Sequence, residues 1–159
     1  MNLIDVKFRF YTHALVLDIV DINEVNEWLF EVIEQNDLDG IPDDFFELVH
    51  YDQKQMLNYI SEQRLTQMKS LQQGRDLLKY YLNKNQLLSS QCLLDDRHLE
   101  KLFNIVNLFD LHQVYEYLSF LYDDGYIDYV YPDKNTADFI NLLDHKRWSH
   151  MFEQIKAYL

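Results

Sequence analysis

The clearest periodic pattern lies in the segment DINEVNEWLFEVIEQND, residues 21–37. Apolar side chains recur there at spacings of three and four, and glutamates recur at the same spacings on the opposite side. The apolar set is Ile22, Val25, Leu29, Val32 and Ile33, with Trp28 at its border, and the acidic set is Glu24, Glu27, Glu31 and Glu34. Asp21 and Glu24 fit a capping box, in which each side chain accepts from a backbone amide of the first turn. The segment is therefore predicted to be an amphipathic helix.

Similar patterns predict helices along most of the remaining chain. The expected segments are residues 42–51, 53–71, 75–88, 97–109, 111–124 and 135–159. Asp52 with Gln55 fits a second capping box, and Asp110 with Gln113 fits a third. Gly74 is expected to break the run between two of these helices, because glycine is a poor helix former.

Two segments have competing patterns. Residues 3–10, LIDVKFRF, alternate apolar and charged side chains as a strand does, but Phe8, Tyr11 and Leu15 continue a helical stripe. We favour a helix over about residues 6–20. Residues 126–131, YIDYVY, are rich in strand-forming side chains and would need a partner strand.

The composition favours helices over sheets. The chain has 159 residues with only three glycines and two prolines, few for a protein made of many tight turns. We predict an all-α protein, with residues 1–159 forming a single compact domain of about six to eight helices in antiparallel pairs. A short β element at residues 3–10, at residues 126–131 or at both stays open.

The charge is strongly negative and unevenly distributed. The net charge is −13, and residues 1–52 contain 13 acidic and two basic side chains. Binding to DNA or RNA rests on clustered lysine and arginine, so nucleic acid is not expected as a partner. The acidic ends permit a basic protein partner, although acidity also serves solubility.

Signals of export or membrane insertion are missing from the sequence. Cys92 is the single cysteine, so it forms no disulfide within the chain. The first 11 residues lack the features of a signal peptide, and no apolar run approaches about 18 residues. We expect a cytoplasmic protein with no membrane partner.

Motifs for catalysis, cofactors or metals are also missing. The three glycines stand too far apart for a phosphate-binding loop, so no cofactor is expected. Cys92, Asp95, Asp96 and His98 lie close together, but the pattern fits a capped helix beside a buried thiol better than a metal site. We predict no metal and no enzyme activity.

A second acidic segment is rich in tyrosine. Residues 115–133, YEYLSFLYDDGYIDYVYPD, contain six tyrosines, five acidic residues and no basic one. Tyrosine provides large contact area at protein interfaces, and neighbouring carboxylates favour lysine and arginine on a partner. Ordinary packing with a solvated acidic rim remains the alternative.

Residues 26–60, including Trp28, Ile33, Pro42, Glu47 and Leu48, look like a helical segment of small bacterial proteins. In size, acidity and lack of catalytic motifs the chain also resembles the immunity proteins of bacterial toxin–immunity pairs. This resemblance implies an inhibitor that neutralises a basic toxin domain, often a nuclease, by covering its active site with carboxylates. It carries no motif from which a functional residue can be transferred.

Our leading hypothesis is therefore an acidic, cytoplasmic protein-binding inhibitor of the immunity type. The predicted partner-binding residues are Glu24, Glu27, Glu31, Glu34, Asp43, Asp44, Tyr122, Asp123, Asp124, Tyr126, Asp128 and Tyr129. The alternatives are a helical adaptor or regulatory subunit for another basic protein and, third, an enzyme whose site uses His98 or His112. The oligomeric state stays open.

Overall fold

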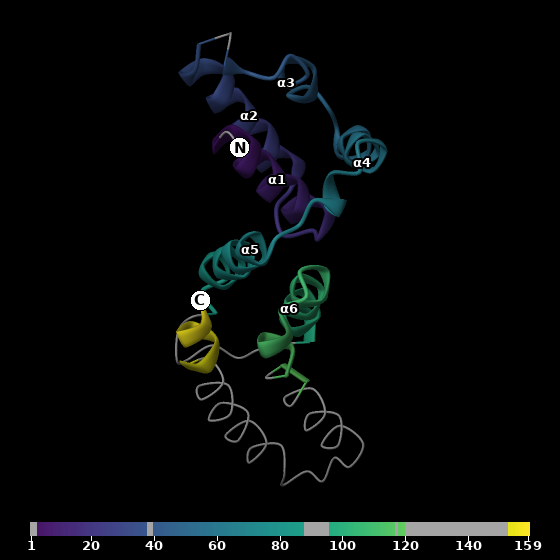
Figure 1. Cartoon of the computed structure of the whole chain (residues 1–159). Helices are drawn as coiled ribbons and strands as arrows, with labels where there is room; N and C mark the ends of the chain where they lie inside the picture. The colour runs from purple at the N-terminus through teal and green to yellow at the C-terminus, as the bar shows by residue number, and fades with distance from the viewer. Residues whose placement is uncertain (1–2, 38–39, 88–95, 117, 120–152) are drawn as a thin grey trace, which may run out of the picture. The chain divides into compact units, whose positions relative to one another are not determined.

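The regular structure of the described residues is helical (Figure 1). The computed structural model describes residues 3–37, 40–87, 96–116, 118–119 and 153–159. No strand occurs in these ranges, so the predicted all-α class is confirmed for them. The labelled helices are α1 (Leu3–Val16), α2 (Ile22–Gln35), α3 (Phe45–Leu48), α4 (Gln53–Glu62), the 3-10 helix η2 (Leu65–Gln67), α5 (Leu71–Lys84) and α6 (Asp96–Leu108). Residues 112–116 and 153–158 are also helical.

The chain divides into two compact units, residues 1–69 and 70–159. The first contains α1 to η2, and the second contains α5, α6 and the C-terminal segment. The expectation of a single domain over residues 1–159 stays a prediction.

Helix α1 decides between the two patterns at the N-terminus. It runs without a break from Leu3 to Val16, so the strand interpretation of residues 3–10 is wrong. A single strand needs a partner, whereas the helix buries Phe8, Thr12 and Leu15 at spacings of four and three. The predicted helix of residues 6–20 therefore begins and ends earlier than expected. The second β candidate, residues 126–131, lies outside the described residues.

Three helices end in the same way, without glycine. Asp18, Gln86 and Asp110 have positive φ values of 55°, 54° and 54°. At the end of α1, the amide of Ile19 donates to the carbonyl of Ala14 at 2.8 Å, which closes a Schellman motif around Asp18. Asp110 likewise ends α6, so its predicted role as an N-cap is wrong, because an N-cap residue has extended backbone.

An aromatic cluster forms the core of the first unit. The ring centroid of Trp28 lies 4.9 Å from that of Tyr11, 6.0 Å from that of Phe45 and 6.3 Å from that of Phe8. These side chains come from α1, α2 and α3, so one tryptophan joins three helices. Trp28 was predicted to lie at the border of the apolar stripe, but only 6% of it is exposed.

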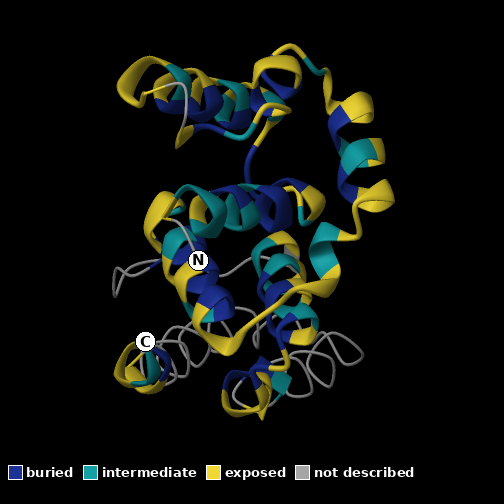
Figure 2. Cartoon of the chain, turned by 45° about the horizontal axis from the view of Figure 1, so that its top comes forward, coloured by how far each residue is buried: buried dark blue, intermediate teal, exposed yellow. Residues whose placement is uncertain are grey.

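Helix α2 has the amphipathic character that its pattern predicts. Val25, Leu29 and Val32 are buried, and Asp21 and Glu24 form the predicted capping box. Helix α4 has the same character, since buried and exposed residues lie on opposite sides of it (Figure 2). Its capping box of Asp52 and Gln55 is also confirmed.

The helix predicted over residues 53–71 is interrupted. Helix α4 ends at Glu62, and Arg64 has a φ of 52°, in the left-handed region. The chain then forms the short helix η2 before α5 begins. The helix predicted over residues 42–51 is also shorter than expected, because α3 covers only Phe45–Leu48.

In the second unit, Gly74 lies inside α5 and does not break it. The helix begins with a capping box of Ser70 and Gln73 that places Gly74 in the second turn. Gly74 is buried, and a Cβ atom placed on it would lie 2.5 Å from the Cβ of Phe109. This glycine therefore permits a close contact between α5 and the end of α6.

His13 is a buried titratable group in α1. Its Nδ1 lies 2.7 Å from the carbonyl oxygen of Arg9. Burial lowers the pKa of His13, the positive charges of Arg9 and Lys69 act in the same direction, and backbone hydrogen bonds oppose them. The neutral imidazole is therefore the form that suits the folded protein.

We expect His13 to make the protein less stable in mild acid. Below a pH of about 6.5 the unfolded chain protonates this histidine and the folded chain does not, so stability falls until the folded pKa is passed. One such proton accounts for at most about 1.4 kcal/mol per pH unit. Urea unfolding at about pH 7.5 and about pH 5.5 should show a smaller acid loss in His13→Asn than in the parent.

The matched control is His50→Asn, which changes an exposed histidine of the same unit. Its acid loss should equal that of the parent. An unchanged loss in His13→Asn would show that this histidine does not govern the response.

None of the helices that the structure describes combines the length and the apolar character of a membrane span.

Candidate functional site

The exposed side of α2 carries most of the acidic residues predicted from its pattern. Glu27, Glu31 and Glu34 are exposed. Glu24 differs, because one of its carboxylate oxygens accepts from the amide of Asp21 at 3.3 Å in the capping box. It is partly shielded and has a structural role that the other three do not share.

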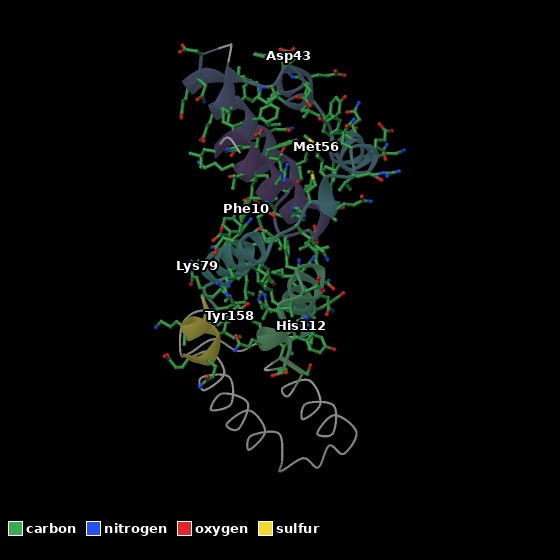
Figure 3. All side chains as sticks on the ribbon, viewed as in Figure 1. Phe10, Asp43, Met56, Lys79, His112 and Tyr158 are labelled. Atoms are coloured by element: carbon green, nitrogen blue, oxygen red, sulfur yellow. The ribbon has the colours of Figure 1, made fainter. Side chains whose placement is uncertain are left out.

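The two aspartates before α3 extend the acidic surface. Asp43 and Asp44 are exposed, and Asp43 lies at the N-terminal side of α3 (Figure 3). Asp44 accepts a short hydrogen bond from the hydroxyl of Tyr59 on α4. This bond joins residues 15 positions apart, so helical spacing could not predict it.

A second tyrosine–carboxylate pair lies beside the first. The hydroxyl of Tyr51 donates to a carboxylate oxygen of Glu47 at 3.0 Å. The rings of Tyr51 and Tyr59 meet edge to face with centroids 6.4 Å apart. Asp44, Glu47, Tyr51 and Tyr59 thus form one cluster, which we call the tyrosine–carboxylate cluster.

Both tyrosines of this cluster keep their protons over a wide pH range. The hydrogen bond to Glu47 is the main cause of the raised pKa of Tyr51. Burial is the main cause of the raised pKa of Tyr59, followed by its hydrogen bond to Asp44. Each phenol therefore acts as a donor that holds one carboxylate in place, and an ionised carboxylate has further lone pairs to accept from a partner.

The side chain of Asn26 connects α2 to this cluster. Its Nδ2 donates to the carbonyl oxygen of Tyr51 at 3.1 Å, across 25 positions in the sequence. Trp28 and Phe45 make a second connection between α2 and α3 from the core side. These contacts hold the glutamates of α2 and the tyrosine–carboxylate cluster on one framework.

Three aromatic rings are exposed on the same framework. Phe30 on α2 is 49% exposed and Phe46 on α3 is 39% exposed. His50, just after α3, is also exposed, and its ring meets that of Phe30 edge to face at 6.3 Å. The sequence pattern did not single out these residues, although Phe30 falls off the apolar stripe of its helix.

Comparison with known proteins assigns the chain to no family. No family model, no curated protein and no solved structure matches the chain. The chemistry of the exposed residues is therefore the basis for interpreting this surface.

The predicted partner-binding residues of the second acidic segment lie outside the described residues. They are Tyr122, Asp123, Asp124, Tyr126, Asp128 and Tyr129. Before them, Leu118 is buried, whereas Tyr115 is 43% exposed and meets Phe103 edge to face at 5.8 Å.

The two histidines considered for catalysis lie in different settings. The Nδ1 of His98 on α6 lies 2.8 Å from the hydroxyl of Tyr81 on α5. His112 is exposed. In the part of the chain that the structure describes, no three histidine, cysteine or acidic side chains converge as a metal site would require. Cys92 and Asp95 lie outside that part.

Proposed function

We propose that this chain is a cytoplasmic inhibitor of the immunity type, which binds a basic toxin domain, a nuclease, and covers its active site. The observation that supports this proposal is the acidic surface of α2 and α3. Glu27, Glu31, Glu34 and Asp43 are exposed on it, beside carboxylates that tyrosines hold in place.

Charge and geometry would act together in such an inhibitor. A nuclease binds phosphates through lysine and arginine, and carboxylates offer those side chains an alternative anionic partner. Exposed carboxylates also accelerate encounter with a basic protein. The hydrogen bonds from Tyr51 and Tyr59 reduce the side-chain freedom that Glu47 and Asp44 would otherwise lose on binding.

The first test is to capture the partner and measure its activity. The product of the gene beside this one is the natural candidate. It should be a basic protein, and an equimolar amount of this chain should abolish its nuclease activity. Tight binding that leaves the partner active would indicate an adaptor or regulatory subunit instead.

Reversing the charges on α2 should slow association with that partner. The variant replaces Glu27, Glu31 and Glu34 by lysine and leaves Glu24 in its capping box. We expect the association rate constant to fall by about tenfold or more at low salt, because like charges now repel. Stopped-flow or surface-based kinetics at several salt concentrations provide the measurement.

A matched control makes the same change of charge elsewhere. Glu100, Glu116 and Glu153 are exposed residues of the second unit, and replacing them by lysine should slow association by less than about threefold. If both triple variants slow association equally, only the total charge matters. The acidic side of α2 would then not be the binding surface.

A further inference from the structure

Phe30 on α2, Phe46 on α3 and His50 just after α3 are exposed aromatic residues, and we call these three residues the aromatic strip. Phe30 and His50 are in edge-to-face contact across α2 and the end of α3. Phe46 lies on α3, four positions before His50, and is also exposed.

Phe30 and Phe46 are exposed, although other aromatic side chains of the same two helices are buried in the core. On the same two helices, Trp28 and Phe45 point into the aromatic cluster and are almost fully buried. Phe30 and Phe46 occur two and one positions later, and 49% and 39% of them is exposed. Exposed phenylalanines on two adjoining helices are typical of a surface that another molecule covers.

Carboxylates neighbour the strip in the sequence, and lysine and arginine do not. Glu27 and Glu34 lie three and four positions from Phe30, so they are its neighbours on α2. Asp43 lies three positions before Phe46. No lysine or arginine occurs between Arg9 and Lys54, a range that contains both α2 and α3.

This distribution of charge selects among the molecules that could cover the strip. A second copy would bring carboxylates against carboxylates, and an anionic membrane surface or a nucleic acid would be repelled in the same way. A basic protein is attracted. Arginine fits best, because its guanidinium stacks on an aromatic face while its donors bind a nearby carboxylate.

We infer that the aromatic strip is the central anchor for a basic protein partner, with arginine side chains of that partner stacked on Phe30 and Phe46 and bound by Glu27, Glu34 and Asp43. This inference rests on the proposed function and gives different roles in binding to the carboxylates and to the aromatic strip. The carboxylates set the rate of encounter, whereas the strip sets the lifetime of the complex.

A short peptide tests the strip without the natural partner. The probe is a capped pentapeptide that alternates arginine with glycine, and its control alternates lysine with glycine at the same charge. In nitrogen–proton NMR spectra of the full chain, the arginine peptide should shift the signals of residues 30, 46 and 50. It should bind at least about threefold more tightly than the lysine peptide, because a guanidinium stacks on an aromatic face while its donors bind a carboxylate.

The double variant Phe30→Ala, Phe46→Ala should remove this difference between the peptides. Tyr115→Ala is the matched control, since Tyr115 is exposed to a similar extent in the second unit. It should preserve the difference. Equal binding of both peptides by the parent chain, or shifts that spread over acidic positions and bypass the strip, would overturn the inference. Circular dichroism checks that each variant folds.

The natural partner separates this inference from the proposed function. In the double variant, the dissociation rate constant should rise by about tenfold or more with little change in association. Full inhibition with an unchanged dissociation rate would refute the strip as anchor and leave the inhibitor proposal standing. Peptide binding at the strip by a chain that inhibits nothing would refute the inhibitor proposal alone. A dimer that the double variant dissociates would assign the strip to self-association and also overturn the inference.

Discussion

Replacing Trp28 by alanine is expected to lower the free energy of unfolding of the first unit by about 3–5 kcal/mol. Trp28 is 6% exposed and contacts aromatic rings from α1 and α3. Alanine would leave a cavity among them and would also remove favourable ring contacts. Chemical unfolding followed by far-ultraviolet circular dichroism provides the measurement, since the change removes a fluorescent residue.

Phe30→Ala is the control for this prediction, because it removes a large aromatic side chain from the same helix. Phe30 is 49% exposed, so we expect a loss below about 1 kcal/mol. Trp28→Phe should fall between the two. Equal losses for Trp28→Ala and Phe30→Ala would contradict both the aromatic core and the exposed position assigned to Phe30.

Replacing Gly74 by valine should destabilise the second unit by about 1–3 kcal/mol. Any Cβ at this position would lie 2.5 Å from the Cβ and 2.7 Å from the Cγ of Phe109. These atoms lie close to the backbone, so a simple rotation of the ring cannot relieve the clash. The small gain in helix propensity over glycine does not offset this overpacking.

Gly40→Ala is the matched control, because a Cβ there meets nothing within 4 Å. We expect its stability to stay within about 0.5 kcal/mol of the parent. Hydrogen exchange should also show faster opening of α5 and α6 in Gly74→Val. A valine variant as stable as the parent would contradict the close packing of these two helices.

Local signals in the sequence predicted where α2 and α4 begin. The capping boxes of Asp21 with Glu24 and of Asp52 with Gln55 are present as expected, because their hydrogen bonds lie within one turn. The box of Ser70 and Gln73 carries the same signature and was not recognised. The expectation that Gly74 breaks the helix was incompatible with a helix that begins at this box. Packing against Phe109 explains why a glycine is present there.

The helix ends were harder to predict. Left-handed residues normally suggest glycine, but here Asp18, Arg64, Gln86 and Asp110 have positive φ values. Backbone hydrogen bonds and the burial of Ile19, Leu87 and Leu111 just beyond three of these ends stabilise the conformation. A pattern that depends on residue type alone does not contain this information.

The acidic side of α2 was predictable and the arrangement around it was not. Helical spacing placed Glu27, Glu31 and Glu34 on the exposed side, as the structure confirms. The bond from Tyr59 to Asp44 and the contact between Phe30 and His50 join separate elements. Such contacts depend on how α2, α3 and α4 pack, which periodicity within a single helix does not specify.

Carboxyl labelling of the complex with the basic partner tests the central claim most directly. Carbodiimide coupling, read by mass spectrometry, reports how accessible each carboxylate is in the free chain and in the complex. Binding through the acidic surface of α2 and α3 should reduce labelling of Glu27, Glu34 and Asp43 by about fivefold or more, as expected for groups in an interface. Glu100, Glu116 and Glu153 should be labelled as in the free chain. Protection of those three, with Glu27, Glu34 and Asp43 still labelled, would contradict the account.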